Sequence, residues 1–500
     1  MRILSIKKFD PDLALLLLLA LARLLLHLLI NGQYGFHRDE LAMLNDARSL
    51  AWGYVAYPPL TPFLGRIELT LFGTSLVGFR FFSALSQSIV MVIAGLMTRE
   101  LGGSRQAQLI AAAATGIGLL SLIQGALFQY VAFDLLWVVL LAYFVIRLLK
   151  SDDPRWWIPI GAVIGLGMMT RYTMGVHTIG LVAATLLTPT RKHLKSPWLW
   201  IGALLAFIIF LPNLIWQIQH NFISLDFQRS IHARDIRIGR TEGYLPEQLL
   251  MANPFVLWIW ITGLIYCFRN STYRMIAWMY VVPFAVFLIM QGRGYYLAPV
   301  YPMLIAAGSA AFIRRVESPD GKNPRRALIL TWAALSLGFI FGACLMLPIG
   351  PVNSVTWNMA ASVQDDFIEE IGWDEFTAQV AQVYNSLPAD ERSHAGILTG
   401  NYGEAGAINL YGPEYDLPKA ICPTDSFWLH GPPDESVDVL VVVGYPQGSA
   451  SQYFKTCELV GEVSNRYGVP NGESEMKDIY LCKGVRQSWS ELWPLMKTYQ

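Results

Sequence analysis

Residues 13–30, LALLLLLALARLLLHLLI, form an apolar run that is followed at once by residues 31–44, NGQYGFHRDELAML. As a helix, the first stretch is long enough to cross the hydrocarbon core of a membrane, which is about 30 Å thick. It is also longer than the apolar region of a signal peptide, about 7–15 residues, so we interpret it as an uncleaved transmembrane helix. The second stretch then places four ionisable side chains at the end of that helix: His37, Arg38, Asp39 and Glu40.

The composition of the whole chain agrees with a membrane protein. Of its 500 residues, 54% are hydrophobic and 15% are charged, and the mean hydropathy is +0.40. Soluble domains average about 25% charged residues. The formal net charge is zero, whereas a nucleic-acid-binding protein presents a basic surface, so no nucleic-acid partner is expected.

Apolar stretches of roughly 15–22 residues, the length of a membrane-spanning helix, recur up to about residue 347. We expect about eleven spans, at residues 13–30, 76–98, 106–124, 131–149, 157–171, 174–188, 198–217, 254–268, 275–290, 297–313 and 327–347. The predicted fold class is an α-helical polytopic membrane domain over residues 1–350, with residues 31–75 as its first outer loop.

Lysine and arginine set the predicted orientation, because short loops rich in these residues stay in the cytoplasm. They gather on one side of the predicted spans: Lys7, Lys8, Arg99, Arg105, Lys150, Arg155, Arg191, Lys192, Lys195, Arg269, Arg274, Arg314, Arg315, Lys322, Arg325 and Arg326. An odd number of spans then places the C-terminal part of the chain outside. The extracytoplasmic location also allows one disulfide among the three cysteines of that part.

Residues 360–500 have the composition of an α/β domain. AGILTG (395–400), VDVLVVVGY (437–445) and MKDIYLCKG (476–484) predict strands. GNYGEAGAINLYG (400–412) predicts a strand-to-helix turn followed by a helix. Because the turn lacks a complete phosphate-binding motif, we favour a packing role over a phosphate site.

The outer loop at 218–250 departs from the charge rule, since it carries Arg229, Arg234, Arg237 and Arg240. Two interpretations remain open at this stage. The loop forms an amphipathic surface helix, or its guanidinium groups bind an anion, since their fork matches phosphate oxygens.

The acids of the first outer loop also allow two interpretations. Leu41, Leu44 and Ala47 recur at helical spacing and predict an amphipathic helix along the membrane surface. Acids in the first turn of that helix would stabilise it by a few tenths of a kcal/mol through the helix dipole. That explains one acid, but not the crowding of Asp39 and Glu40 with a histidine and an arginine.

A second acidic position lies at the outer end of the fourth predicted span. Asp134 is followed by apolar residues, and an acid at the edge of the hydrocarbon is costly enough to suggest a function. The alternative is a helix N-cap, which aspartate forms well. The predicted topology places Arg171 and Arg293 on the same outer side, so carboxylates and guanidinium groups are expected around one cavity.

Five stretches together resemble the glycosyltransferase family 39 membrane enzymes, which include protein O-mannosyltransferases and are similar to lipid A aminoarabinose transferases. They are, in order, YGFHRDELAML, LAWGYVAYPPLTPFL, FDLLWVVLLAYFVIRLL, GLGMMTRYT and YYLAPVYPMLIAAG. The resemblance covers about residues 10–315, and residues 400–418 are similar to the outer domain of many bacterial members. It implies a GT-C fold, a bacterial inner (cell) membrane, and transfer of a sugar from a polyprenyl-phosphate carrier.

The resemblance also implies roles for individual residues. Asp39 occupies the position of the family's general base, which takes the proton of an acceptor hydroxyl during an inverting attack on the anomeric carbon. Glu40 would orient the base or the acceptor. The other expected substrate-binding residues are Arg38, Tyr57, Asp134, Arg171, Arg293 and Tyr296. Among them, Arg293 and then Arg171 are the first choices for stabilising the leaving phosphate.

The expected partners are a polyprenyl-phosphate-linked sugar, an acceptor that is a protein, lipid or glycan, and membrane lipids. No metal site is predicted, because the outer-loop histidines lack a usual ligand spacing, although a divalent metal remains open. The alternatives are a transporter or lipid flippase, and an outer binding module on inert spans. A transporter usually has related halves around a midplane site, whereas here the charges lie at the outer interface.

Overall fold

The computed structural model describes residues 10–319, 323–472 and 476–500. Lys7, Lys8 and Lys322, which contributed to the predicted orientation, lie outside these residues. The chain forms two compact units. The helical unit contains the residues up to Ile30, Arg80–Ile215 and Asp235–Leu347, and the mixed unit contains Asn31–Phe79, Trp216–Arg234 and Pro348–Gln500.

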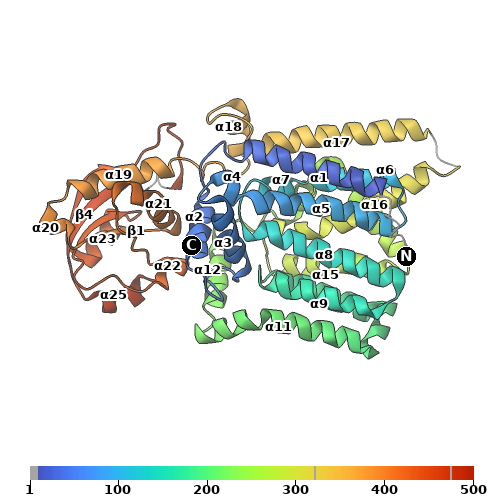
Figure 1. Ribbon diagram of the computed structural model, residues 1–500, viewed down its shortest axis with the longest axis horizontal. Helices are drawn as coiled ribbons and strands as arrows, with labels where there is room; N and C mark the ends of the chain where they lie inside the picture. The colour runs from blue at the N-terminus through green and yellow to red at the C-terminus, as the bar shows by residue number, and fades with distance from the viewer. Residues whose placement is uncertain (1–9, 320–322, 473–475) are drawn as a thin grey trace, which may run out of the picture. The chain divides into compact units, whose positions relative to one another are not determined.

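The helical unit is a bundle of apolar helices with nearly parallel long axes (Figure 1). Its α-helices are α1 (Pro11–Ile30), α5 (Phe81–Glu100), α6 (Arg105–Gly116), α7 (Leu119–Gln124), α8 (Tyr130–Ser151), α9 (Trp157–Met168), α10 (Met174–Leu187), α11 (Pro197–Gln219, whose last turn belongs to the mixed unit), α13 (Tyr244–Met251), α14 (Leu257–Arg269), α15 (Arg274–Ile289), α16 (Tyr301–Val316) and α17 (Pro324–Met346). Short 3-10 segments complete it: η1 (Pro154–Trp156), η2 (Pro189–Lys195), η3 (Pro254–Val256) and η4 (Gly294–Val300).

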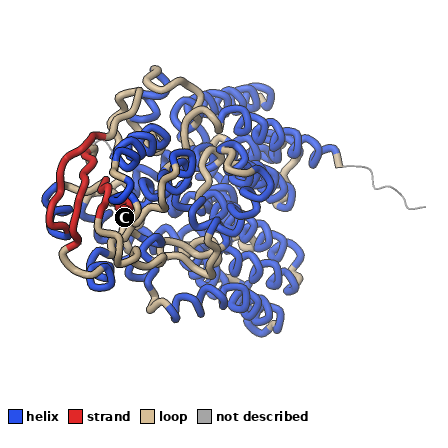
Figure 2. Tube along the Cα trace, turned by 60° about the vertical axis from the view of Figure 1, so that its left-hand side comes forward, coloured by secondary structure: helices blue, strands red, loops and turns tan. Residues whose placement is uncertain are grey.

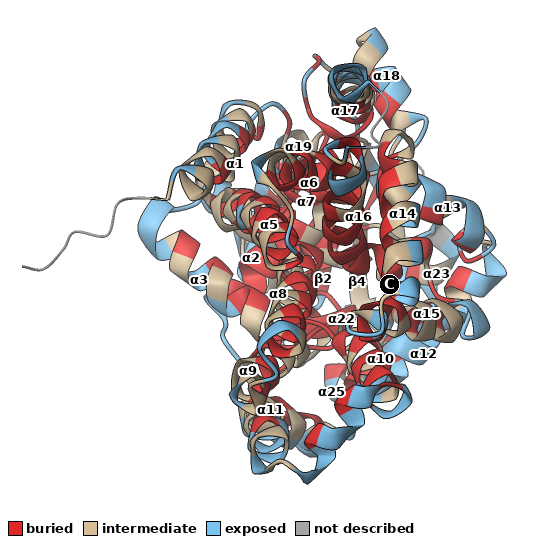
Figure 3. Ribbon diagram, turned by 90° about the vertical axis from the view of Figure 1, so that its right-hand side faces the viewer, coloured by how far each residue is buried: buried red, intermediate tan, exposed pale blue. Residues whose placement is uncertain are grey.

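Burial separates the central from the peripheral helices of this unit (Figure 3). In the segment formed by η4 and α16, 83% of the span is buried, whereas the corresponding value for α11 is 11%. α16 packs on α5, α6 and α14. A helix that is apolar on every side and buried on every side belongs to the core, and an apolar helix left exposed is suited to lipid.

Each of the eleven predicted spans is helical, but their number as spans is not confirmed. In the described part of the chain, six helices are long and apolar enough to cross a membrane, or up to seven if a pair bent by 75° counts as one. Hydropathy missed a break at Ile117 and Gly118, which separates α6 from α7. α10 and α15 are apolar but short.

The mixed unit combines Asn31–Phe79 and Trp216–Arg234 with the C-terminal part of the chain, Pro348–Gln500. Its helices are α2 (Arg38–Arg48), α3 (Leu60–Phe72), α4 (Leu76–Phe79), α12 (Ile223–Arg237, whose end belongs to the helical unit), α18 (Val355–Ala361), α19 (Trp373–Ser386), α20 (Ala389–Arg392), α21 (Tyr402–Tyr411), η5 (Gly412–Tyr415), α22 (Asp425–Trp428), α23 (Gln447–Tyr453) and α25 (Trp489–Met496). Its strands are β1 (Ala395–Thr399), β2 (Val439–Val443), β3 (Phe454–Glu462) and β4 (Asp478–Val485).

The four strands form one sheet in the order β1-β2-β4-β3. The strands are drawn in red in Figure 2. β1 and β2 are parallel, and β4 pairs antiparallel with both β2 and β3. The three predicted strands are therefore present. The sequence analysis missed β3, an edge strand whose residues are mostly exposed and therefore lack the alternating apolar pattern that identifies a half-buried strand.

Cys457 on β3 lies directly opposite Cys482 on β4, and the two form a disulfide. Cys422, the third cysteine of the C-terminal part, is buried and free. The structure thus selects one of the pairings that the spacing left open.

α2 packs on α21 at a distance that only glycine permits. A Cβ atom on Gly406 would lie 2.7 Å from Cβ of Leu41, and one on Gly403 would lie 2.9 Å from Cβ of Arg38. Leu41, Leu44 and Ala47 are buried. The predicted amphipathic helix is present, but Leu41 on its apolar face contacts protein, because an apolar stripe does not distinguish lipid from a protein partner.

The turn before α21 has a packing role, as favoured from the sequence. Asn401 caps α21, and one carboxylate oxygen of Glu404 accepts hydrogen bonds from the backbone N–H groups of Gly400 and Asn401, at 2.9 and 3.3 Å. These amides are engaged by the protein's own carboxylate, so they do not form a vacant phosphate site.

The arginine-rich segment 218–250 contains the amphipathic helix α12. Ile223, Phe227 and Ile231 form its buried face and cluster with Val55 and Trp216. Three arginines of this segment are exposed: Arg229, Arg237 and Arg240. Arg229 lies 3.7 Å from Asp226 in an exposed pair. The helical interpretation of this loop is correct.

Candidate active site

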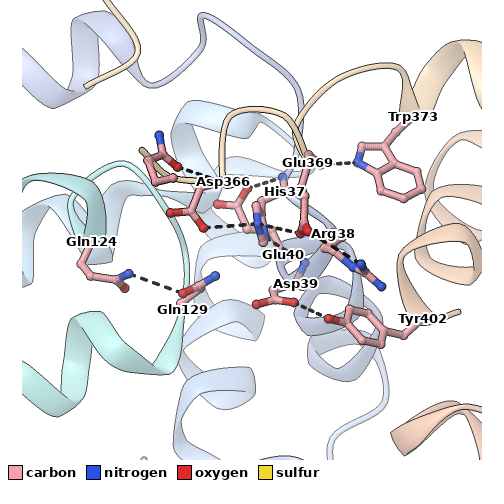
Figure 4. Close-up of polar contacts among 11 residues, drawn as sticks. His37, Arg38, Asp39, Glu40, Gln124, Gln129, Asp366, Glu369, Trp373 and Tyr402 are labelled. Carbon is pink, nitrogen blue, oxygen red and sulfur yellow. Dashed lines mark hydrogen bonds and ion pairs between the residues drawn. The ribbon is translucent and has the colours of Figure 1, made fainter. Parts of the chain in front are cut away.

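The segment His37–Glu40 forms the beginning of α2 (Figure 4). His37 is the N-cap, and its Nδ1 accepts a hydrogen bond from the backbone N–H of Asp39 at 3.1 Å. Glu40 is buried, and its Oε2 accepts the backbone N–H of His37 at 2.9 Å. Such reciprocal contacts satisfy backbone groups that a helix start leaves without partners. Glu40 thus stabilises the start of α2, as one of the two interpretations of these acids expected. Its role in orienting the base or the acceptor remains a prediction.

Asp39 is partly exposed, and its carboxylate contacts the C-terminal part of the chain. The hydroxyl of Tyr402, at the start of α21, donates a hydrogen bond of 2.7 Å to Oδ1 of Asp39. The guanidinium of Arg38 lies 4.7 Å from the centre of the Tyr402 ring. Burial raises the pKa of Tyr402 well above its usual value, and the Asp39 charge adds to this effect. The phenol is therefore the donor and Asp39 the acceptor.

His37 connects this site to two further acids. Its Nε2 lies 3.5 Å from Oδ1 of Asp366 and 3.3 Å from Oε2 of Glu369. Burial lowers the pKa of His37, but the hydrogen bond to Glu369 and the nearby carboxylates outweigh it and raise the pKa above its usual value. A second proton on Nδ1 would remove the acceptor for the Asp39 N–H, so the helix cap opposes this rise. Nε2 carries a proton in either state.

Asp425 is a further acid, and its charge interacts with that of Asp39. The sequence analysis did not single it out. It has a left-handed backbone, with φ of 50°, and its side chain is largely buried. Burial raises the pKa of Asp425 well above its usual value, and the Asp39 charge contributes to the rise. A non-glycine residue held in this conformation is costly and is frequent at functional sites.

Tyr57, a predicted substrate-binding residue, is buried against α2. Its hydroxyl donates a hydrogen bond of 2.7 Å to Oδ2 of Asp46. Burial raises the pKa of Asp46 to about 7, although the hydrogen bonds from Tyr57 and Asn45 act in the opposite direction. The observed contact of Tyr57 fastens the loop after α2 to that helix.

In the helical unit, Asp134 and Arg171 form a buried pair. Nη1 of Arg171 lies 3.4 Å from Oδ2 of Asp134, and the Thr173 hydroxyl donates to the same oxygen at 3.1 Å. Asp134 does not cap α8, because that helix begins at Tyr130 and Gln129 is its N-cap. The N-cap interpretation of Asp134 is therefore wrong.

Three tyrosines surround the guanidinium of Arg171. The ring centres of Tyr130, Tyr295 and Tyr296 lie 5.1, 5.1 and 4.7 Å from its central carbon. Its Nη2 also donates a 3.1 Å hydrogen bond to the Tyr295 hydroxyl. Cation–π contacts of this kind strengthen when they are shielded from water. The predicted residues Asp134, Arg171 and Tyr296 are therefore brought together.

Arg293 is held by an acid that the sequence analysis did not select. Its Nε and Nη2 bind the two carboxylate oxygens of Asp235, at 2.6 and 2.9 Å. The Asp235 side chain is 3% exposed and the Arg293 side chain 19%. This bidentate pair fixes the plane of the guanidinium group. An anion bound by Arg293 would contact Nη1, the nitrogen that Asp235 does not bind.

The described ranges contain no group of three or more His, Cys, Asp or Glu side chains arranged to hold a metal ion. The acids beside His37 are instead accounted for by their contacts with its ring and with Arg38.

Comparison with known proteins places these residues in context. Residues 56–216 match the family model for dolichyl-phosphate-mannose-protein mannosyltransferase. The structure of ArnT from Cupriavidus metallidurans in the apo state matches with 13% identity and a TM-score of 0.59, over 97% of this chain and 99% of that chain. The fold is that of the GT-C glycosyltransferases. No curated protein matches the sequence.

The chain also matches ArnT from Cupriavidus metallidurans bound to undecaprenyl phosphate, with 14% identity and a TM-score of 0.57, over 94% of this chain and 97% of that chain. The predicted resemblance to family 39 glycosyltransferases is confirmed. The apolar helices and these likenesses agree with an integral membrane protein. The family match includes Tyr57, Asp134 and Arg171, and Asp39 precedes it.

Proposed function

We propose that this protein is an integral-membrane, inverting glycosyltransferase. It moves a sugar from a polyprenyl-phosphate carrier to a hydroxyl or phosphate of a protein, lipid or glycan acceptor on the outer face of the membrane. The observation that carries the proposal is the carboxylate of Asp39, partly exposed after the first apolar helix and held by a tyrosine hydroxyl in a GT-C chain. The family match and the fold support the use of a lipid-linked sugar.

Asp39 would act as the general base when the acceptor is a hydroxyl. Its carboxylate takes the hydroxyl proton while the acceptor oxygen forms a bond to the anomeric carbon. The bond from that carbon to the carrier phosphate breaks, and the phosphate leaves with the electron pair. Attack opposite the leaving group inverts the configuration. Positioned general bases contribute about 10²–10⁴-fold to the rate of such steps.

The arginines of the helical unit would bind the carrier phosphate. Arg293 remains the first choice, because its side chain is more exposed than that of Arg171. Asp235 occupies Nε and Nη2 of Arg293, so the phosphate would be bound through Nη1. Guanidinium groups that face the departing phosphate stabilise the charge that develops there. Arg171 and its tyrosines are the second choice.

We further propose that the membrane is a bacterial inner membrane and that residues 360–500 are extracytoplasmic. The Lys/Arg distribution supports this orientation. The disulfide between Cys457 and Cys482 supports it independently, since structural disulfides persist in oxidising compartments. An alkaline phosphatase fusion after Gln500, which is active only outside the cytoplasm, should be active. Activity of a cytoplasmic reporter alone at that position would refute the orientation.

The function is tested with the purified full-length protein in lipid nanodiscs. The donors are polyprenyl phosphates carrying radiolabelled mannose or aminoarabinose, and the acceptors are serine- and threonine-rich peptides or lipid A. Transfer of label together with release of polyprenyl phosphate supports the proposal. Movement of intact donor across a vesicle membrane, without cleavage of the sugar–phosphate bond in any donor–acceptor pair, would instead support a flippase.

A further inference from the structure

Tyr402 connects the C-terminal part of the mixed unit to Asp39. Tyr402 is the first residue of α21, directly after the Asn401 cap, and its hydroxyl lies 2.7 Å from Oδ1 of Asp39 (Figure 4). The close packing of α2 on α21 fixes the two helix starts relative to each other. The contact joins positions that are 363 residues apart in the chain.

We propose that Tyr402 is a positioning residue of the transferase site, and that the C-terminal α/β domain therefore completes the site instead of serving as a separate binding module. The phenol binds Oδ1 of Asp39 and thereby fixes the orientation of the carboxylate that would take the acceptor proton. This inference rests on the proposed function of Asp39. Tyr402 itself transfers no proton and does not touch the reacting atoms.

Two physical features suit Tyr402 to this role. The ring is held by Arg38, whose guanidinium lies 4.7 Å from its centre, so the hydroxyl has little freedom to leave Asp39. A hydrogen bond donated to an ionised carboxylate favours that ionised form. A base that has to be ionised and correctly oriented benefits from both effects, because small displacements of a catalytic group strongly reduce its efficiency.

Other charged and titratable groups from several segments interact with this pair: His37, Arg38, Tyr57, Asp366 and Asp425. Glu369 acts on His37 and Arg38, and Arg234 acts on Asp425. These groups remain the same when only the Tyr402 hydroxyl is removed. A change in the pH dependence of transfer between the two proteins therefore reports the loss of that hydroxyl.

The test compares Tyr402→Phe with the wild-type protein, with Tyr415→Phe as the matched control and Asp39→Asn as the reference for loss of the base. Tyr415 belongs to the same domain and is exposed. Label transfer from polyprenyl-phosphate mannose or aminoarabinose is measured across pH, with kcat and KM for the donor. Tyr402→Phe should lower kcat about 10-fold to 100-fold, the loss expected for one hydrogen bond to a charged group.

The KM for the donor should change little, and the acidic limb of the pH–rate profile should move to higher pH. An unchanged kcat, or a lower kcat with an unshifted profile, would overturn the positioning role. If Tyr402→Phe folds poorly, replacing Tyr402 with a fluorotyrosine keeps the hydroxyl and makes it a stronger donor. The acidic limb should then move to lower pH, and an unmoved limb would overturn the proposal.

The reference variant separates this inference from the proposed function. If Asp39→Asn is inactive while Tyr402→Phe behaves like Tyr415→Phe, Asp39 remains the base and only the positioning role fails. If Asp39→Asn retains full transfer, the proposed mechanism itself fails, whatever Tyr402→Phe does.

Discussion

Replacing Gly406 with alanine should disturb the site through packing alone. Gly406 lies on α21, and an added Cβ would be 2.7 Å from Cβ, 2.8 Å from the carbonyl carbon and 2.9 Å from the carbonyl oxygen of Leu41 on α2. Two of these atoms belong to the backbone, so a side-chain rotation cannot relieve the contact. The two helices must move apart.

Two opposing effects set the size of the change in stability. Overpacking of a tightly fitted contact costs about 1–3 kcal/mol. Alanine in a helix is favoured over glycine by about 1 kcal/mol. The net loss should therefore be about 0–2 kcal/mol. Transfer should fall by more than this loss of stability explains, because Tyr402 lies one helical turn before Gly406 and would be displaced from Asp39.

The assay measures thermal unfolding and label transfer for the full-length protein, with Gly448→Ala as the control. Gly448 is a helical glycine of α23, and an added Cβ there meets no atom within 4 Å. The control should be as active as wild type and equally stable or slightly more stable. If Gly406→Ala matches Gly448→Ala in both measurements, the fit between α2 and α21 does not set the geometry of Asp39.

Three other predictions concern separate parts of the molecule. Arg293→Ala should raise the KM for the polyprenyl-phosphate sugar, because the loss of one charged contact costs about 1.5–3 kcal/mol. Arg293→Lys should lose less. Equal donor kinetics in both variants and in the wild type would show that Arg293 is not part of the phosphate site. Because burial raises the pKa of Asp46 to about 7, the folded state binds its proton more tightly than the unfolded state, so this group's contribution to stability should decrease as pH rises from about 4 to 7. Thermal unfolding of Asp46→Asn should show a weaker pH dependence over that range, and an identical dependence would contradict the argument. The chain denatured without reductant should expose three thiols to alkylation, since Cys457 and Cys482 are paired, and five reactive thiols in protein isolated from membranes would contradict the extracytoplasmic location.

The sequence predicts the local features of this protein better than its long-range contacts. Apolar length identified the long helical stretches of the membrane domain, because burial and lipid both require apolar side chains, but it did not mark α3 or α13. It did not identify where helices break, since Ile117 and Gly118 sustain the apolar pattern while ending α6. The strand β3 was missed because an exposed edge strand has no apolar alternation to detect.

In the candidate site, too, the sequence indicates local features but not long-range contacts. Asp39 stands out in the sequence because ionisable groups crowd at the end of an apolar helix. Its partner Tyr402 does not, because nothing local marks a contact across 363 residues. The same holds for Asp235 beside Arg293. By contrast, the capping contact of Glu40 was accessible from the sequence, since a glutamate three residues after a cap position commonly binds the cap backbone.

The central claim is that Asp39 is the base, and the most direct measurement is the turnover of Asp39→Asn beside Glu40→Gln in the same transfer assay. Asparagine keeps the shape of the side chain and can still accept the Tyr402 hydrogen bond, but it cannot take the acceptor proton. Turnover of Asp39→Asn should fall by about 10²–10⁴-fold with donor binding retained, and Glu40→Gln should lose much less, because its amide oxygen can still accept the His37 N–H. An Asp39→Asn protein with wild-type turnover would contradict the account.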